Sequence, residues 1–357
     1  MNNETCDSNV KPAKKRHGCG CLTAFLVFVG VMVALGIVGI FILAALPGGG
    51  TSRLPKSHGT NFDPSNYGED ECPNMVEVWS SGCGTTRVVR IPLTGMIHFG
   101  EGSAVPGAIG GTESTLRAIR RATLDDSVKG ILLDVDSGGG GITASDIVYD
   151  ALLKFRAAQP GRVIVAHFGD TAASGAYYIS LAADCIIASP TTLTGSIGVI
   201  MQSYNVHGLA EKIGVTDVTL KSGANKDLLN PLAEVDPEQQ ALLQEVVDQL
   251  YARFVGLVAE NRHLPETKVR ELADGRVFLA QKALDEGLID GIGYEDDAIA
   301  KLAELLGEED LEVDRYEENF SVWDIFRRER SIFGMKMLLD GLFDSSSPAL
   351  QYRWPVR

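Results

Sequence analysis

The chain is poor in cysteine, with six in 357 residues, and this scarcity limits the chemistry to be expected. No spacing of cysteine and histidine is typical of a metal site, so we expect neither a metal nor another cofactor. Cys72 and Cys83 flank a short segment and are the candidate pair for a single disulfide. The apolar setting of Cys185 favours a buried, inert thiol.

Positive charge is also scarce. The chain has 32 Lys and Arg against 47 Asp and Glu, a net charge of −15. Residues 1–46 carry a net charge of +2, which leaves −17 for the remainder. Because the phosphate backbone requires a basic surface, this balance argues against a nucleic-acid partner.

One long hydrophobic run lies near the N-terminus. Residues 21–46 carry no charge over 26 residues, and a helix needs only about 20 to cross the hydrocarbon core of a membrane. The run is longer than the apolar region of a signal peptide, and no convincing small-residue cleavage site follows it. We therefore expect a retained transmembrane helix that spans the cytoplasmic (inner) membrane once. Basic residues precede it in a tail over 1–20, which places that tail in the cytoplasm and the rest of the chain on the extracytoplasmic side: Lys11, Lys14, Lys15 and Arg16.

Apolar strands, Gly-rich turns and helices alternate after a linker over 47–86, which includes the candidate disulfide loop. We predict strands at 87–97, 130–137, 162–169 and 184–189, and helices at 114–125, 142–158 and 237–262. The alternation is typical of an α/β fold, in which crossover helices connect the strands of a parallel sheet. We assign this fold to one domain, 87–307, followed by a C-terminal extension, 308–357.

The stretch GDTAASGAYY (169–178) places Ser174 between Ala173 and Gly175, directly after an apolar strand. Small neighbours let another group approach closely, which suits a nucleophile and also suits a tight strand-to-helix turn. The glycine run at 138–141 likewise follows a strand. Because ligands of parallel sheets bind at the carboxyl ends of the strands, we expect these two segments to meet at one edge of the sheet.

A nucleophilic serine needs a base, and histidine is the usual one. None of the six histidines stands in a setting that indicates a triad, the GxSxG motif is absent, and His167 lies inside an apolar strand as a core histidine would. A lysine can serve instead where burial disfavours its charged form. The stretch TLKSGANKDLLNP (219–231) supplies two candidates, Lys221 and Lys226, and an ordinary surface lysine is the alternative for both.

Five ordered blocks give the chain a resemblance to a known family. The blocks are LLDVDSGGGGITASD (132–146), GDTAASGAYYISLAAD (169–184), TLTGSIGVIM (192–201), LKSGANKDLLNP (220–231) and ADGRVF (273–278) with GLIDGIG (287–293). Over about residues 87–305 the chain resembles the signal peptide peptidase A family, membrane-anchored serine proteases of bacteria. The resemblance implies a fold similar to that of ClpP and the crotonase group. It also implies a homo-oligomeric ring whose active sites form at subunit interfaces.

The resemblance implies roles for particular residues. The nucleophile falls on Ser174, and the base falls on Lys226, the lysine that precedes an aspartate. Backbone N–H groups of Gly175 and of the Gly-rich turn, at Gly139 or Gly140, are then expected to hold the oxyanion. These glycines satisfy the need for donors near a strand end, where a substrate backbone must approach closely.

Two further points concern the same blocks. Ser196, in TGSIG, is a candidate to hydrogen-bond the lysine amine, and a simple turn-forming serine is the alternative. The family usually reads S-P-G-G after the strand, whereas this chain has Ser137-Gly138-Gly139-Gly140. Loss of the proline should make the turn more flexible, which puts the rigidity of the oxyanion hole in question but not the identity of its donors.

The function that these features favour is a membrane-anchored Ser/Lys endopeptidase that cleaves hydrophobic, membrane-released peptides such as signal-peptide remnants. Two alternatives stay open, one from a different class and one also an enzyme. One is a non-catalytic scaffold that binds peptides or assembles a ring at the membrane. The other is a crotonase-type acyl-CoA enzyme, which is disfavoured because an extracytoplasmic domain has no evident supply of CoA thioesters.

Overall fold

The computed structural model describes residues 75–98, 112–318 and 351–353, all within one compact unit, Arg53–Arg357. The predicted cytoplasmic tail and the predicted transmembrane helix at 21–46 lie outside the described residues. Within the ranges just given, no helix combines the length and the apolar character needed to span a membrane.

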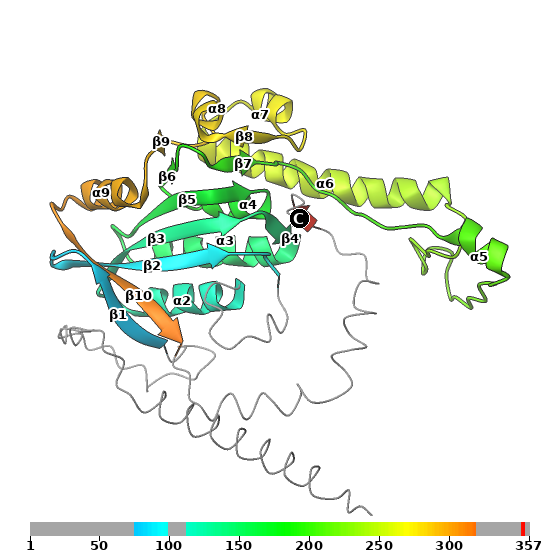
Figure 1. Ribbon diagram of the computed structural model, residues 1–357, viewed down its shortest axis with the longest axis horizontal. Coiled ribbons are helices and arrows are strands. Elements are labelled where there is room, and N and C mark those ends of the chain that lie inside the picture. The colour runs from blue at the N-terminus through cyan, green and yellow to red at the C-terminus, as the bar shows by residue number, and fades with distance from the viewer. Residues whose placement is uncertain (1–74, 99–111, 319–350, 354–357) are drawn as a thin grey trace, which may run out of the picture. The chain divides into compact units, whose positions relative to one another are not determined.

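A mostly parallel sheet forms the centre of this unit (Figure 1). Its strands are β1 (Met75–Ser81), β2 (Thr86–Thr94), β3 (Val128–Ser137), β5 (Val163–Ala173), β6 (Cys185–Ala188), β7 (Leu193–Gly195), β8 (Val277–Leu279), β9 (Gly291–Ile292) and β10 (Leu311–Glu318). The order across the sheet is β1-β10-β2-β3-β5-β6-β9, with β7 paired to the end of β5 and β8 paired to β7. Only β1–β10 and β7–β8 are antiparallel among these described pairs. A second, two-stranded sheet pairs β4 (Gly139–Gly141) with β11 (Gln351–Arg353).

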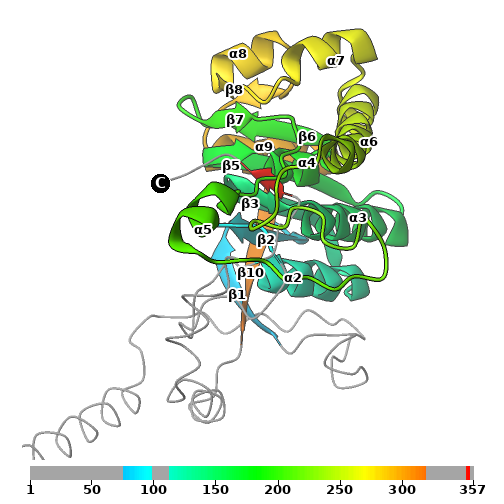
Figure 2. The ribbon, with the colours of Figure 1, turned by 90° about the vertical axis from the view of Figure 1, so that its right-hand side faces the viewer.

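Helices cover both faces of the sheet (Figure 2). They are α2 (Thr112–Leu124), α3 (Ile142–Ala158), α4 (Gly175–Ser180), α5 (His207–Ile213), α6 (Pro237–Arg262), α7 (Glu266–Leu272), α8 (Ala280–Asp285) and α9 (Glu295–Leu306). The larger apolar core joins one face of the sheet to α2, α3, α4 and the C-terminal half of α6. A smaller core joins the opposite face to α9.

The apolar run of β3 explains why both faces need covering. Leu133 faces the larger core while its neighbour Leu132 faces α9, because successive side chains of a strand point to opposite faces. A strand buried on both faces reads as a continuous hydrophobic run. In α3 the buried residues Val148, Leu152 and Phe155 recur at spacings of four and three, as a helix with one apolar face requires.

The predicted α/β class is confirmed, and the helices predicted at 142–158 and 237–262 have the observed bounds. The sheet nevertheless extends past the predicted domain, 87–307, on both sides. Strand β1 lies within the predicted linker, and β10 lies within the predicted C-terminal extension. Strand β10 pairs with β2 and β1 pairs with β10, so segments from before and after the predicted domain build one edge of the sheet.

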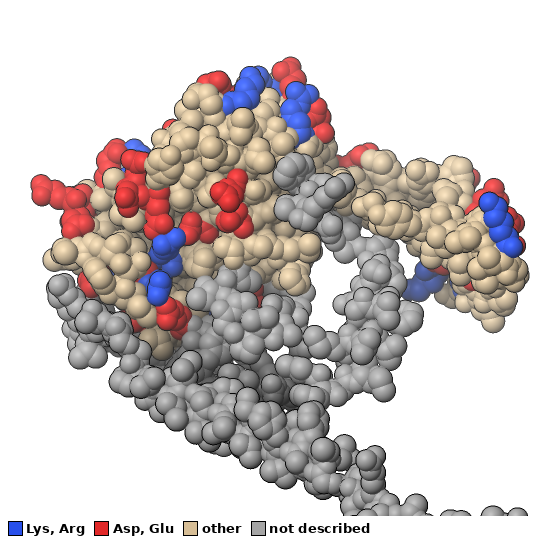
Figure 3. Space-filling model, viewed as in Figure 1, with Lys and Arg blue, Asp and Glu red and all other residues tan. Residues whose placement is uncertain are grey.

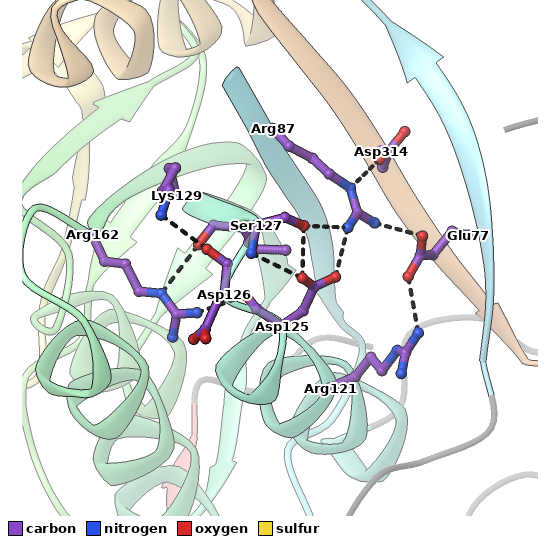
Figure 4. Close-up of polar contacts among 10 residues, drawn as sticks. Glu77, Arg87, Arg121, Asp125, Asp126, Ser127, Lys129, Arg162 and Asp314 are labelled. Atoms are coloured by element: carbon purple, nitrogen blue, oxygen red, sulfur yellow. Dashed lines mark hydrogen bonds and ion pairs between the residues drawn. The ribbon is translucent and has the colours of Figure 1, made fainter. Parts of the chain in front are cut away.

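A buried ion-pair cluster attaches these two strands to β2 (Figure 4). Arg87 donates hydrogen bonds to Asp314 of β10 and to Asp125, each at 2.6 Å, and pairs with Glu77 of β1 at 2.7 Å. Burial alone would lower the pKa of Arg87, but the surrounding anionic groups raise it. Burial would also raise the pKa of Asp125, but hydrogen bonds from Ser127 and the charge of Arg87 hold it below its usual value. Arg87 and Asp125 therefore stay charged, whereas burial raises the pKa of Asp314 above its usual value.

Arg87→Met should lower the free energy of unfolding by about 3 kcal/mol or more, because it leaves buried carboxylates without their counter-charge. Denaturant unfolding of the full-length chain measures this loss. The matched control is Arg315→Met, which breaks the exposed Arg315–Glu317 ion pair within β10. This substitution should lower the free energy of unfolding by less than about 1 kcal/mol. Equal losses in the two variants would contradict the role given to the cluster.

Candidate active site

Ser174 occupies a strained turn between β5 and α4. Its backbone angles are φ 57° and ψ −117°, in a region that costs a residue with a side chain about 1–3 kcal/mol. The end of β7 holds this turn in place, since the Ser174 N–H donates to the Gly195 carbonyl at 2.8 Å. A serine on a sharp strand-to-helix turn is the arrangement that presents the nucleophile in α/β-hydrolases.

The Ser174 hydroxyl is buried, and its oxygen has no hydrogen-bond partner in the part of the chain that the structure describes. A buried hydroxyl without a partner is unfavourable and unusual in native proteins. The described part of one chain therefore brings no base to this oxygen. The predicted nucleophile therefore lies on the turn expected of it, but the described residues supply no group to take its proton.

Ser196 lies beside Ser174. Strand β7 runs parallel to the end of β5 with Ala173 opposite Gly195, so the two serines follow these paired residues on adjacent strands. Ser196 also has a positive φ, 51°, and its N–H donates to the Arg276 carbonyl at 2.8 Å. The predicted lysine-orienting residue thus stands at the same strand end as the predicted nucleophile.

Two of the predicted oxyanion glycines, Gly139 and Gly140, lie in β4, and the third, Gly175, is the first residue of α4. The backbone groups of the β4 glycines make different contacts. The Gly139 N–H donates to the Ser137 hydroxyl at 3.1 Å, and the Gly141 N–H donates to the Ile97 carbonyl at 2.7 Å. A Cβ on Gly140 would lie 2.0 Å from the Ile97 carbonyl oxygen, so only glycine fits there. Because backbone groups alternate in direction along a strand, the Gly140 N–H points away from Ile97. Gly140 is therefore better placed than Gly139 to donate to a ligand.

Ser137 compensates for the missing proline in this turn. Its hydroxyl donates to the Gly95 carbonyl at 2.5 Å and accepts from the Gly139 N–H. The Gly95 N–H in turn donates to the Asp136 carbonyl at 3.1 Å. Three hydrogen bonds thus hold a segment whose sequence alone suggests greater flexibility.

Strand β11 pairs with β4 in the antiparallel direction, with Tyr352 opposite Gly140 and Arg353 opposite Gly139. An extended segment of the chain therefore lies along the edge of β4 that faces away from Ile97. The arrangement shows that this edge of β4 accepts an added strand.

The two tyrosines that follow Ser174 anchor α4. The Tyr177 hydroxyl is buried and donates to the Leu288 carbonyl at 2.7 Å, and burial raises the pKa of Tyr177 above its usual value. The Tyr178 hydroxyl donates to Asp146 of α3 at 2.6 Å. Both tyrosines therefore fix the helix that begins at the nucleophile, a role that the sequence pattern did not reveal.

Lys226 lies elsewhere in the chain, in a segment that we call the arm, residues 200–250. The arm comprises α5, the loop after it and the N-terminal half of α6, and Figure 1 shows α6 extending from the sheet toward α5. The Lys226 side chain is exposed, whereas Lys221 pairs with Asp227 at 2.6 Å. Ser174 and Lys226 therefore do not meet in the described structure of one chain.

The arm exposes apolar side chains. Eleven of the eighteen large hydrophobic residues that are exposed in the described ranges belong to it: Ile200, Tyr204, Val206, Leu209, Ile213, Val215, Val218, Leu220, Val235, Leu242 and Val246. Figure 3 shows few charged side chains along the arm except at its tip. A cavity of about 480 Å³ lies within it, lined partly by Lys221 and Asp227. A surface this apolar marks an interaction site.

The remaining candidate groups are placed as follows. His167 is buried and lies 3.4 Å from both Asp134 and the Ser189 hydroxyl, so it is a core histidine with polar partners. Cys185 is buried, and burial raises its pKa to about 11, as expected of an inert thiol. Cys83 is a free, exposed thiol, and Cys72 lies outside the described residues, so the disulfide stays a prediction. In the described ranges, no group of three or more His, Cys, Asp or Glu side chains could hold a metal ion.

Comparison with solved structures gives only distant likenesses. A membrane-bound stomatin-specific protease has a TM-score of 0.39 at 14% identity and covers 62% of this chain and 86% of its own. ClpP1 from Listeria monocytogenes has a TM-score of 0.35 at 13% identity and covers 58% of this chain and 92% of its own. Scores of this size do not establish a common fold, so the finer likeness to ClpP and the crotonase group stays a prediction.

Comparison of sequences identifies the family. Residues 156–309 match Peptidase family S49. A protein of Enterococcus faecium named signal peptide peptidase SppA is 37% identical over 277 residues, covering 77% of this chain and 79% of that protein. Protease 4 of Salmonella typhi is 37% identical over 63% of this chain and 36% of its own length, and the chloroplastic serine protease SPPA of Arabidopsis thaliana is 32% identical over 63% and 33%. The chain therefore belongs to the signal peptide peptidase A family and is a serine peptidase.

Proposed function

We propose that the protein is a Ser/Lys endopeptidase that cleaves hydrophobic peptides, such as signal-peptide remnants, on the extracytoplasmic side of the cytoplasmic membrane. The observation that carries this proposal is Ser174 itself, a buried hydroxyl on a strained turn that follows β5. The glycine strand β4 supports it, because its outer edge pairs with an added strand, β11. The predicted anchor at 21–46 supports the location. Substrates released within the same membrane would then reach the site without crossing a long aqueous distance.

In the proposed reaction, the Ser174 hydroxyl oxygen attacks the carbonyl carbon of the scissile peptide bond. The neutral amine of Lys226 takes the hydroxyl proton and then gives a proton to the leaving amine, so the peptide C–N bond breaks and an acyl-enzyme forms. The backbone N–H groups of Gly175 and Gly140 stabilise the oxyanion of each tetrahedral intermediate. Water, activated by the same amine, then hydrolyses the ester and regenerates Ser174.

Lys226 is supplied by a neighbouring subunit in this proposal. Two observations favour such an assembly: the Ser174 oxygen lacks a partner in the described part of its own chain, and the arm exposes a large apolar surface. Packing that surface against a second copy would bury it and bring Lys226 to the next subunit's Ser174. A closed ring satisfies every such contact and keeps all the predicted membrane anchors on one side. Ser196, at the same strand end as Ser174, would hydrogen-bond the incoming amine.

Peptide substrates bind along β4 as an added antiparallel strand in this proposal. The pairing of β11 with β4 supports this mode, because main-chain hydrogen bonds of that kind accept many side-chain sequences. Backbone pairing would give affinity, and the apolar surroundings would give the preference for hydrophobic peptides.

The test of the proposal is a set of substitutions in the full-length chain, assayed on a panel of hydrophobic peptides with the cleavage sites mapped. Ser174→Ala and Lys226→Arg should each lower kcat by about a thousandfold or more, since nucleophile and base act as a unit and arginine stays protonated. Lys221→Arg is the matched control and should retain activity within a few-fold. Activity that survives in Lys226→Arg but is lost in Lys221→Arg would show that the base has been assigned to the wrong lysine.

A shared active site predicts complementation. Co-expression of Ser174→Ala and Lys226→Arg chains should restore about a quarter of wild-type activity, because about half of the serines and half of the neighbouring lysines are intact in a random ring. The control is co-expression of each single variant with the double variant Ser174→Ala/Lys226→Arg. Both of these mixtures should stay inactive, because one contains no Ser174 and the other contains no Lys226. If the first mixture stays inactive, or if a protein that sediments as a monomer has full activity, the active site is not shared between subunits.

The pairing of β11 with β4 predicts competition with substrate. Tyr352→Pro removes the backbone N–H opposite Gly140 and should lower KM for peptides a few-fold with kcat unchanged, because the substrate no longer displaces a paired strand. Tyr352→Ala keeps the backbone N–H and is the matched control. Steady-state kinetics of both variants decide the point, and identical KM values would show that β11 does not compete for this edge.

A further inference from the structure

Three side chains from three helices meet at one point beside the active site. Arg253 of α6 donates to Asp146 of α3 at 2.6 Å and to the Tyr178 hydroxyl at 3.1 Å. The Tyr178 hydroxyl, on α4, donates to the same oxygen of Asp146 at 2.6 Å. The three groups therefore close a triangle in which every polar contact joins a different pair of helices.

Each of these three residues lies close in the chain to a part of the candidate active site. The Tyr178 N–H donates to the Ser174 carbonyl at 2.9 Å, so Tyr178 lies one helical turn from the nucleophile. Asp146 lies in the first turns of α3, which begins at the residue after β4. Arg253 follows the arm, at the point where α6 enters the core with Phe254.

Aromatic packing keeps the Tyr178 hydroxyl in place. The Tyr178 ring makes edge-to-face contacts with Tyr149 of α3 at 5.5 Å and with Phe254 of α6 at 5.2 Å between ring centroids. Tyr178 is buried, whereas the Arg253 side chain is 54% exposed. Burial alone would raise the pKa of Asp146, but the bonds from Arg253 and Tyr178 lower it, so this acceptor stays ionised.

We infer that Arg253 is a positioning residue of the active site. Its side chain connects the arm to α4, the helix that follows Ser174, and to α3, the helix that follows the glycine strand β4. This inference rests on the proposed function, because it assigns a purpose to the arm that carries Lys226. Arg253 touches neither Ser174 nor β4 and acts only through Tyr178 and Asp146.

A general contribution to stability does not explain this arrangement. An ion pair as exposed as Arg253–Asp146 adds little to the free energy of unfolding. The planar guanidinium, however, reaches an anion and a hydroxyl on different helices at once, which a lysine ammonium does with much less geometric definition. A small displacement of catalytic groups lowers the reaction rate far more than it lowers stability. The same bonds are therefore minor for folding and important for alignment.

In the proposed ring, the contacts of Arg253 with Asp146 and Tyr178 link neighbouring active sites. The arm of one subunit supplies Lys226 to the next subunit, while Arg253 at its base contacts the helices that form its own subunit's site. A displacement of α4 in one site would therefore reach the arm that completes the adjacent site.

The test compares Arg253→Met, Arg253→Lys and Tyr178→Phe with the matched control Arg270→Met. Arg270 also makes an exposed ion pair, with Glu266, and contacts an aromatic ring of α6, Tyr251, but neither of these contacts involves α3 or α4. In the full-length chain, Arg253→Met should lower kcat about tenfold or more with KM within twofold of wild type. Arg253→Lys should recover part of that loss, and Tyr178→Phe combined with Arg253→Met should lower kcat no further than the worse single variant.

Melting temperature and sedimentation should match those of Arg270→Met, and amide hydrogen exchange should rise in α4 and at the start of α3. A kcat within twofold of wild type, an equal loss in Arg270→Met, or a loss that follows dissociation of the assembly would each overturn the inference. Complete recovery in Arg253→Lys would do so as well, because charge alone would then suffice. Hydrogen exchange requires no catalysis, so it tests the role of Arg253 even if the wild-type chain cleaves no peptide. In that case, unchanged exchange in Arg253→Met overturns the positioning role, and raised exchange supports it independently of the proposed chemistry.

Discussion

The backbone of Ser174 is the constraint on which the rest of the site depends. A positive φ at a residue with a side chain persists only where the surrounding structure enforces it. Here the Gly195 carbonyl holds the Ser174 N–H on one side, and the two tyrosines of α4 hold the helix that follows. Gly195 itself has a φ of 86° and would bring a Cβ within 2.6 Å of the Phe278 ring. The strained backbone of Ser174 is therefore held by a hydrogen bond to Gly195, a position where only glycine fits.

The same structure leaves one part of the chain without support. The body of the fold buries its apolar residues in two cores, whereas the arm buries little and exposes most of its large hydrophobic side chains. Water-exposed apolar area of this extent is unfavourable for an isolated chain. Among the described residues, the Ser174 oxygen thus has no hydrogen-bond partner and the apolar side chains of the arm have no cover. Association of identical subunits would supply both.

Much of this architecture was predictable because its signals are local. The apolar runs of β3 and β5 and the helical spacing of α3 need no knowledge of distant residues. Strands β1 and β10 were missed because they lie in segments whose overall composition is typical of a linker and an extension. In the fold, Arg87 pairs with residues on both of them. Ser174 was found by its small neighbours and by resemblance. The contact of Arg253 with Asp146 spans 107 positions, and no spacing rule links two charged residues that far apart.

Under the proposed function, the division of the catalytic pair makes activity a property of the assembly. A chain whose base lies on an exposed arm cannot complete proton transfer at its own Ser174 in the described conformation. Subunits that have not yet associated would then be inert toward other polypeptides in the membrane. The strain at Ser174 and the exposed surface of the arm both cost free energy in the isolated chain, and both become useful at the same event, when a neighbour's lysine reaches the buried hydroxyl.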